Sequence, residues 1–316
     1  MRENLKIVAL AGGVGGAKFA HGLAQYLSSE ELTIIVNTGD DFEHYGLYIC
    51  PDLDTVCYTL AGLANPQTGW GQVNETWKVI ENATRLGGPD WFRLGDQDLG
   101  THLERTRRLR QGQPLSQITK DFCEAWGMRE KILPMTDQPV RTIVETAEGD
   151  LSFQEYFVHR RCEPRVTGFH FEGIELARPA PGTQEALREA DAIILCPSNP
   201  WVSIDPILNV LSPLNPREDV PAPVFAISPI IGGQTVKGPA AKMFGELGIE
   251  PSALAVAKHY GNLVNGFVLD RVDRQLEGQI RDLHMHTCVT NTLMISHEDR
   301  KKLAREVLNF IDGLNL

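Results

Sequence analysis

A glycine-rich loop between an apolar run and a helical pattern is the strongest constraint on how this chain folds. The run at residues 7–10 predicts a buried strand, and Phe19, Leu23 and Leu27 recur at helical spacing beyond the loop. The loop itself contains Gly12, Gly13, Gly15 and Gly16, with Lys18 following. Glycines let the backbone approach an anion closely, and a helix N-terminus offers free N–H groups. We therefore expect a phosphate or diphosphate site here, although the spacing fits neither a Walker A loop nor GxGxxG. The alternative is a tight turn whose glycines serve packing alone.

A second apolar run, at residues 32–36, ends in an acidic segment that begins with Asn37. The acids that follow within about fifteen residues are Asp40, Asp41, Glu43, Asp52 and Asp54. Ligands of open α/β sheets bind beyond the carboxyl ends of the strands, so this segment should lie beside the glycine loop. Clustered carboxylates repel one another unless a cation lies among them, and oxygen ligands near a diphosphate suggest Mg²⁺. We expect Asp40, Asp41 and Asp54 as metal ligands and Asn37 as a nucleotide contact. Alternatively, Asp40 binds the ribose of a dinucleotide, or the segment is a solvated acidic loop.

The rest of the chain alternates strand and helix patterns, which predicts an α/β fold with a Rossmann-like, doubly wound, mostly parallel sheet. We expect one domain over 1–316, interrupted by a helical insertion at approximately 55–135 and a small antiparallel β lobe at 140–178. Within that lobe, strands are expected at 140–145 and 151–158. Further strands are expected at 192–196, 224–227, 253–257, 267–270 and 288–290, and a closing helix at 297–313.

Two later strand ends carry polar loops that should reach the same edge of the sheet. Ser198 and Asn199 follow one strand, and Ser228 follows the next. We expect these three side chains to hydrogen-bond a base or a sugar. A glycine pair with a lysine, made of Gly232, Gly233 and Lys237, resembles a second anion contact.

The insertion holds a loop at residues 89–98 with two aromatic residues, an arginine and three acids. Trp91 and Phe92 could form a stacking surface or belong to a core. His102 and Arg105 follow this loop closely, and for them a ligand role is as reasonable as a solvated helix face.

Composition narrows the class of protein. The chain has 316 residues, a formal net charge of −11 and a pI of about 5.3, which argues against nucleic acid as a partner. The six cysteines form no CxxC motif, which is typical of a reduced, cytoplasmic protein. No apolar run approaches the length of a membrane span or a signal peptide, so no membrane partner is expected.

Several long strings resemble the 2-phospho-L-lactate transferase family of coenzyme F420 biosynthesis, which includes the phosphoenolpyruvate transferases of many bacteria. The strings are GGVGGAKF, NTGDD, PDLDT, LGDQDLGTHLERT, ILPMTD, FQEYFVHRRCEP, CPSNPWVSI, SPIIGG and VKGPAAKM. The resemblance implies transfer of a phospholactyl or phosphoenolpyruvyl group from a guanosine diphosphate ester to the deazaflavin Fo, with release of GMP and with Mg²⁺ as the metal. It also implies that Asp54 and Arg93 contact Fo, with Trp91 beside them.

On this reading Asp41 and Asp54 are the candidate catalytic residues, Asp41 as a metal ligand and Asp54 as a ligand or general base. One departure from the family pattern is Asn291, where an aspartate is expected. The main alternative is a non-catalytic regulator from a sister family, which binds a nucleotide sugar or dinucleotide. A nicotinamide dehydrogenase is less favoured, because no proton-transfer pair is evident near a hydride site. The sequence does not distinguish lactyl from enolpyruvyl donors, and it is compatible with a homodimer.

Overall fold

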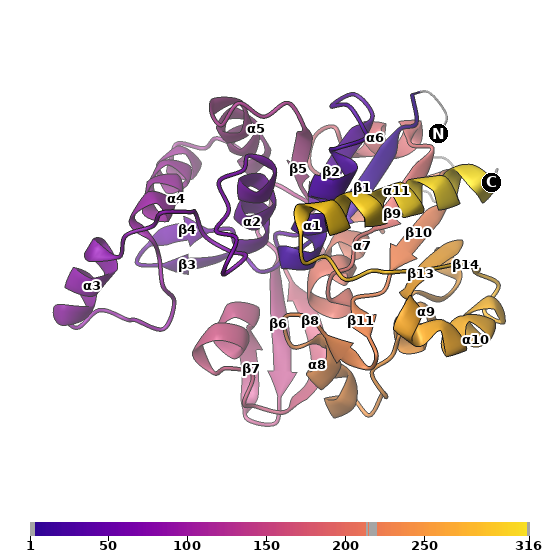
Figure 1. Ribbon diagram of the computed structural model, residues 1–316. Coiled ribbons are helices and arrows are strands. Elements are labelled where there is room, and N and C mark those ends of the chain that lie inside the picture. Colours follow the sequence, from indigo (N-terminus) through magenta and orange to yellow (C-terminus); the bar gives the residue numbers. More distant parts are fainter. Residues whose placement is uncertain (1–3, 213, 215–219, 315–316) are drawn as a thin grey trace.

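A parallel sheet of seven strands forms the centre of the molecule (Figure 1). The computed structural model describes residues 4–212, 214 and 220–314, so both ends of the predicted domain extend beyond the described residues. The strand order is β14-β13-β10-β9-β1-β2-β5, and every pair is parallel. The strands are β1 (Ile7–Ala11), β2 (Leu32–Val36), β5 (Lys131–Pro134), β9 (Ala192–Leu195), β10 (Val224–Ile227), β13 (Gly266–Asp270) and β14 (His286–Thr290). The chain runs from β1 outward to β5, returns to β9 beside β1, and continues to β14. This is the predicted doubly wound order.

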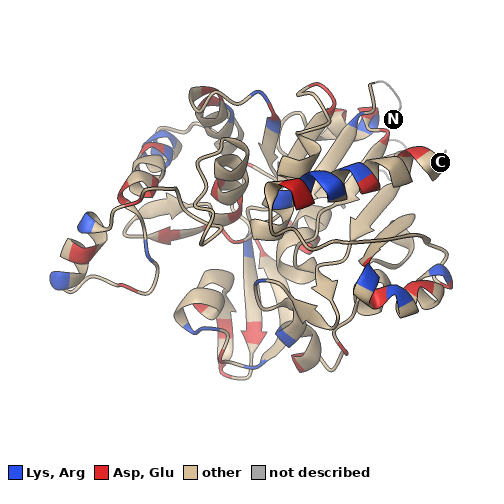
Figure 2. Cartoon of the chain, viewed as in Figure 1, with Lys and Arg blue, Asp and Glu red and all other residues tan. Residues whose placement is uncertain are grey.

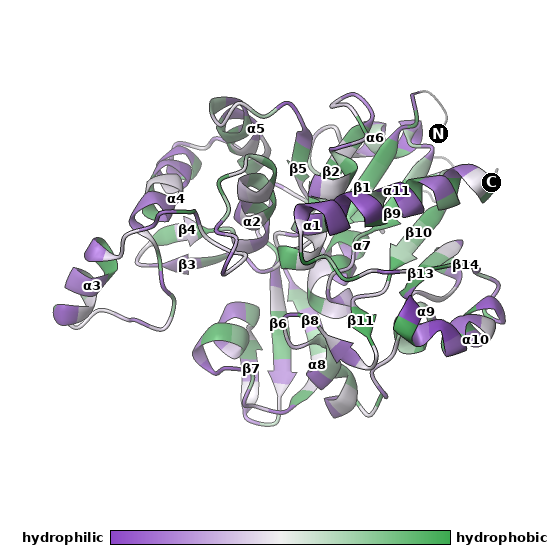
Figure 3. Cartoon of the chain, in the orientation of Figure 1, coloured by the Kyte–Doolittle hydropathy of each residue, from purple (hydrophilic) through white to green (hydrophobic). Residues whose placement is uncertain are grey.

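Helices cover both faces of the sheet. Alternate residues of each strand point to opposite faces, and both sets are apolar, so each face must be buried. In β1, Ile7 and Ala9 belong to one buried cluster, and Val8 and Leu10 belong to the other. The first face packs against α1 (Gly13–Leu23), α2 (Pro51–Leu60), α5 (Leu115–Ala125) and α11 (His297–Leu314). The second packs against α6 (Thr183–Glu189), α7 (Asp205–Leu211), α8 (Ala240–Glu246) and α9 (Ala253–Tyr260). Figure 3 shows the apolar central strands and the polar outer face of α11.

Two excursions from the sheet flank its edge. The first connects β2 to β5 and contains the hairpin β3 (Phe42–His44) and β4 (Leu47–Ile49), with helices α2, α3 (Lys78–Arg85), α4 (Asp96–Arg110) and α5. The second is an antiparallel sheet of β7 (Gly149–Ser152), β6 (Arg141–Thr146) and β8 (Val166–Glu172). In Figure 1 the helical insertion extends to the left and this β lobe lies below the sheet. Smaller elements are β11 (Ile230–Ile231), β12 (Gln234–Thr235) and α10 (Glu277–Arg281).

Two predicted strands are wrong. Residues 253–257 begin helix α9, because Ser252 accepts a hydrogen bond from Ala255 N and caps a stretch of good helix formers. The predicted strand 151–158 ends at Ser152, and Glu155–His159 forms a π-helical turn instead. A second π-helical turn covers Pro200–Ile204. Single π-turns are rare and frequently occur at functional sites.

Charged side chains lie on the outer helices, and Figure 2 shows both signs mixed along α10 and α11. Within the described part of the chain, no helix has the length and hydrophobicity required to cross a membrane.

Candidate functional site

The glycine loop lies where the chain order reverses, between β1 and β9. The hydroxyl of Ser198, just beyond β9, donates to the carbonyl of Gly12 at 2.7 Å, which joins the two strand-end loops. Helix α1 starts within the loop, at Gly13, whose φ of 59° favours glycine. The switch point of a doubly wound sheet is the usual ligand crevice of such folds.

The glycines of this loop serve two purposes. A Cβ at Gly15 would collide with the carbonyl oxygen of Pro197, and a Cβ at Gly16 would lie 2.8 Å from Ser198 Oγ. These two glycines therefore allow the loop to pack against the end of β9. A Cβ at Gly13 would meet only Asp52 Oδ1, at 3.6 Å, so this position is open. The packing alternative thus explains Gly15 and Gly16, while Gly13 lies on the cavity wall beside the carboxylate of Asp52.

A cavity of about 730 Å³ opens beside this loop, and most of the predicted site residues line it. Those on its wall are Gly12, Gly13, Gly15, Lys18, Asp40, Asp54, Trp91, Arg93, Ser198, Asn199, Ser228 and Lys237. Those absent from the wall are Gly16, Asn37, Asp41, Gly232 and Gly233. The volume falls within the range of pockets that hold cofactor-sized ligands.

Two lysines, Lys18 and Lys237, lie on the cavity wall that also includes the glycine loop, where an anion is expected to bind. Lys18 Nζ donates to the carbonyl of Met294 at 2.8 Å, and Lys237 Nζ donates to the carbonyl of Thr68 at 2.6 Å. Neither of these bonds is to a carboxylate, so neither neutralises the positive charge. Burial, followed by repulsion from Arg300 and Lys237, lowers the pKa of Lys18. An anion here would relieve that repulsion.

The polar strand-end side chains that we expected to contact a base already have partners in their own loops. Asn199 Oδ1 accepts from Trp201 N at 3.1 Å, and Ser228 Oγ accepts from Ile230 N at 3.1 Å. The N–H of Gly232 donates to the carboxylate of Asp273. These hydrogen bonds hold the loops of the wall in place, and the base and anion contacts expected of these residues stay predictions.

The acidic segment divides into two parts. Asp40 and Asp52 both line the cavity, and the side-chain amide of Asn37 lies 3.2 Å from Asp40 Oδ1 and 2.9 Å from Asp52 Oδ2. Burial raises the pKa of both carboxyls, and in Asp40 the charge of Asp52 raises it further. Asn37, predicted as a nucleotide contact, instead holds these acids. Asp41 lies off the cavity wall, and neither of its buried carboxylate oxygens has a hydrogen-bond partner within the described part of the chain.

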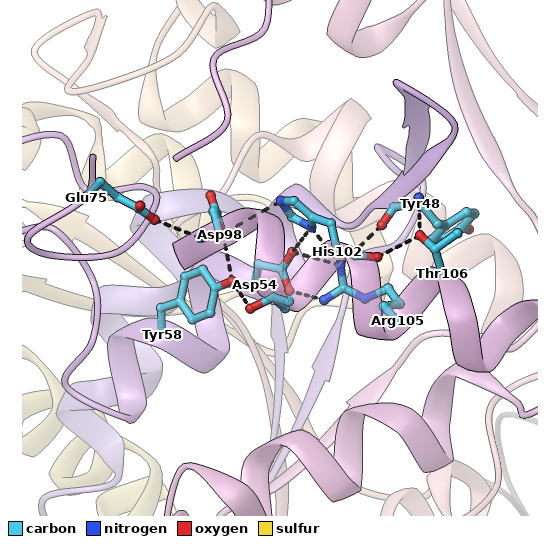
Figure 4. A network of polar contacts seen from close by, with 9 residues as sticks. Tyr48, Asp54, Tyr58, Glu75, Asp98, His102, Arg105 and Thr106 are labelled. Carbon is cyan, nitrogen blue, oxygen red and sulfur yellow. Dashed lines mark hydrogen bonds and ion pairs between the residues drawn. The ribbon is translucent and has the colours of Figure 1, made fainter. Parts of the chain in front are cut away.

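A buried polar network connects Asp54 to helix α4 (Figure 4). Both oxygens of Asp54 accept from the guanidinium of Arg105, with Arg105 Nη1 at 3.0 Å from Oδ2. Arg105 is only 2% exposed, so its predicted ligand role is replaced by an ion pair. The same guanidinium lies 3.3 Å from His102 Nδ1. Asp54, predicted as metal ligand or base, therefore already accepts one hydrogen bond at each oxygen from Arg105, and its predicted role stays a prediction.

An aromatic wall closes the insertion side of the cavity. Trp91 lies against Phe42 and His44, and it stacks on His159 of the β lobe with ring centroids 5.1 Å apart. Arg93, also on the wall, lies over the ring of Trp77. Trp91 therefore belongs to a small core and also lines the cavity. The two alternatives raised from the sequence, a stacking surface and a core position, do not exclude each other.

Several wall residues had no role in the sequence-based prediction. They include Thr55, Tyr58, Trp70, Asp98, Phe153 and Ser203. Asp98 lies in the first turn of a helix, and this position could have identified it. At the departure from the family pattern, the Asn291 side chain is exposed and lies off the cavity wall.

Comparison with known proteins bears on the family of this chain. The family model described as "2-phospho-L-lactate transferase CofD" matches residues 7–310. A phosphoenolpyruvate transferase from Streptomyces coelicolor is 41% identical over 98% of both chains. One from Thermobifida fusca is 43% identical over 85% of this chain and 87% of its own.

Among solved structures, a UPF0052 family protein (BH3568) from Bacillus halodurans superposes with a TM-score of 0.63. It covers 98% of this chain and all of its own at 15% identity, which shows a shared fold. The family model over residues 7–310 and the curated relatives over nearly the whole length place this chain in the 2-phospho-L-lactate transferase CofD family.

Proposed function

We propose that this protein transfers a phosphoenolpyruvyl group from enolpyruvyl-2-diphospho-5'-guanosine to the ribityl hydroxyl of the deazaflavin Fo, producing dehydro-F420-0 and GMP. The observation that carries the proposal is a cavity that joins the glycine loop at the start of α1 to an aromatic wall on the insertion. The names of the curated relatives favour the enolpyruvyl donor. The family description keeps the corresponding lactyl ester, which would give F420-0, as the other donor to test.

In this proposal the donor's diphosphate binds at the start of α1. The free N–H groups of the first helical turn would bind phosphate oxygens, and Lys18 and Lys237 would supply positive charge. Guanosine would occupy the neighbouring wall formed by the loops after β9 and β10. Much of the rate enhancement would then come from positioning and from stabilisation of the negative charge on the departing GMP.

We also propose Mg²⁺ as the metal, held by Asp40 and Asp52. The two carboxylates share one wall and one amide donor, and their charges need a counter-ion beside a diphosphate. Among the described residues, no three His, Cys, Asp or Glu side chains converge on a metal position. This suits Mg²⁺, which usually takes one or two carboxylates together with waters and substrate phosphates. Such an ion would neutralise charge on the diphosphate. Asp41, with its unpartnered oxygens behind this wall, stays a predicted ligand.

The acceptor Fo would bind on the insertion side. Its planar ring would lie along the wall formed by Trp91 and its neighbours, since aromatic rings favour offset or edge contacts. Arg93 and Asp54 both line the cavity, and they stay the Fo contacts that the family resemblance implies.

The decisive experiment combines the purified protein, Fo, Mg²⁺ and each donor ester. We expect GMP and a deazaflavin product whose mass has increased by the transferred group, with loss of both when Mg²⁺ is chelated. The enolpyruvyl ester should have the higher kcat/KM. A protein that binds GDP but forms no GMP with either donor would instead support the regulatory alternative.

A further inference from the structure

A buried histidine on the cavity wall has a hydrogen-bond donor with no partner. His102 is 2% exposed, and its Nδ1 lies 3.3 Å from Arg105 Nη1. A guanidinium can only donate, so Nδ1 must accept. Burial and the charge of Arg105 lower the pKa of His102, which keeps the ring neutral. The single ring proton is therefore assigned by this network to Nε2.

The Nε2–H group points toward Asp98 without reaching it. Nε2 lies 3.7 Å from Asp98 Oδ1, which is too long for a hydrogen bond, and Nε2 has no other partner among the described residues. A buried donor left unpaired is destabilising and rare in folded proteins, so its presence calls for an explanation.

Asp98 supplies an acceptor on the same wall. It lines the cavity with His102, one helical turn away on α4, and Oδ1 accepts from the hydroxyl of Tyr58 at 2.7 Å (Figure 4). A donor and an acceptor are thus held side by side, slightly too far apart to bond each other. An alcohol oxygen between them satisfies both, because a hydroxyl accepts one hydrogen bond and donates another.

Asp54 is less suited to this task. Both of its oxygens accept from Arg105, so a proton taken from an alcohol would cancel the negative charge of a buried ion pair. Burial, and then the charge of Asp54, raise the pKa of Asp98 to about 7. A base with a pKa near the working pH is the most effective.

We propose that Asp98 and His102 form the subsite for the attacking hydroxyl of the acceptor, with His102 Nε2–H donating to its oxygen. This inference rests on the transferase function proposed above. As the alcohol oxygen bonds to the phosphorus that carries the three-carbon acid, its proton passes to the Asp98 carboxylate. The bond from that phosphorus to the bridging oxygen breaks, and GMP departs with the electron pair.

The test pairs acceptor variants with protein variants. Fo and an Fo analogue without the terminal hydroxyl are titrated into the wild type, His102→Asn and His102→Gln. We expect the wild type to prefer Fo by about 2- to 10-fold, the equivalent of one neutral hydrogen bond. The amide nitrogen of Gln occupies roughly the place of Nε2, so His102→Gln should keep the preference. Asn can replace only Nδ1, so His102→Asn should lose it. Asp98→Asn should bind Fo and lose turnover by roughly 10²–10⁴.

Asp96→Asn is the matched control, since Asp96 is in the same helical turn and accepts from Thr76 outside the cavity. GDP affinity reports whether each variant retains the fold. A preference for Fo that persists in His102→Asn, or that survives better there than in His102→Gln, would show that His102 serves only Arg105. Near-normal turnover in Asp98→Asn would equally overturn the inference. If the wild type neither binds nor converts Fo, the proposed function itself fails, and this subsite fails with it.

Discussion

At the scale of single residues, the most consequential contact is the ion pair between Asp54 and Arg105. Both side chains are buried, and burial alone raises the pKa of Asp54 while Arg105 lowers it. Removing one partner leaves the other charge uncompensated, so we expect Arg105→Leu to lower the free energy of unfolding by about 3–5 kcal/mol. Urea denaturation gives this value directly.

The neighbouring Arg107 is the control for this substitution. It pairs with Glu104 on the exposed side of α4, where solvent screens the interaction. Arg107→Leu should therefore change the urea midpoint very little. Equal losses in the two variants would mean that the buried ion pair contributes no more than a surface pair.

Asp98 should make stability depend on pH in a defined direction. Its pKa rises from an ordinary value of 3.8 to about 7, chiefly through burial. Between these values the folded state binds more protons than the unfolded state, so stability contributed by Asp98 is lost as pH rises toward 7. We expect Asp98→Asn to raise the melting temperature relative to wild type more at pH 8 than at pH 5.

Asp96→Asn provides the comparison, because the Thr76 hydrogen bond lowers the pKa of Asp96 below its ordinary value. That carboxylate is ionised in both states from pH 5 to 8, so its effect should not vary with pH in this range. An equal shift at pH 5 and pH 8 for Asp98→Asn would contradict the raised pKa.

The sequence predicted which loops supply the site better than it predicted what each residue does there. Position along a strand or helix indicates which edge a side chain reaches, which is why Lys18, Asp40, Ser198 and Lys237 all lie on the wall. Hydrogen-bond partners distant in the chain decide the role. The partner of Asp54 is on α4, 51 residues later, and no local pattern specifies that pairing.

At the scale of elements, long periodic segments were predicted well and short apolar ones were not. The closing helix was expected at 297–313 and spans His297–Leu314, with Leu303 and Val307 buried. The five residues 253–257 fit either a buried strand or a buried helix, because periodicity cannot separate the two over so short a run. Only the capping residue Ser252 distinguishes them.

Ser252 should therefore make a measurable contribution to the stability of α9. Its hydroxyl accepts from Ala255 N at 3.1 Å, so Ser252→Ala should lower the free energy of unfolding by about 1 kcal/mol. Ser252→Thr keeps the acceptor and should recover most of the loss. A loss of the same size in both variants would show that the cap does not stabilise the helix.

At the scale of the whole molecule, the order of the strands followed from the chain, whereas the closure of the cavity did not. Alternating strands and helices favour one doubly wound sheet, and the reversal of strand order then fixes where ligands bind. The cavity also needs walls from the insertion and from the β lobe. The insertion and the β lobe contact each other through side chains that are about seventy residues apart in the sequence. The clearest of these contacts is the stack of Trp91 on His159.

That stack gives a prediction about substrate selectivity for the molecule as a whole. If the insertion and the β lobe together hold the acceptor, His159→Ala should loosen the aromatic wall and leave the anion end intact. An aromatic pair contributes about 0.5–1.5 kcal/mol, so the KM for Fo should rise about 2- to 10-fold while GDP affinity is unchanged. His170→Ala is the control in the same lobe, because His170 pairs with Glu145 and stands apart from the stack. Steady-state kinetics with Fo varied, beside GDP calorimetry, separates the two ends of the cavity. An equal weakening of both ligands would show that the stack supports the whole cavity rather than the acceptor wall.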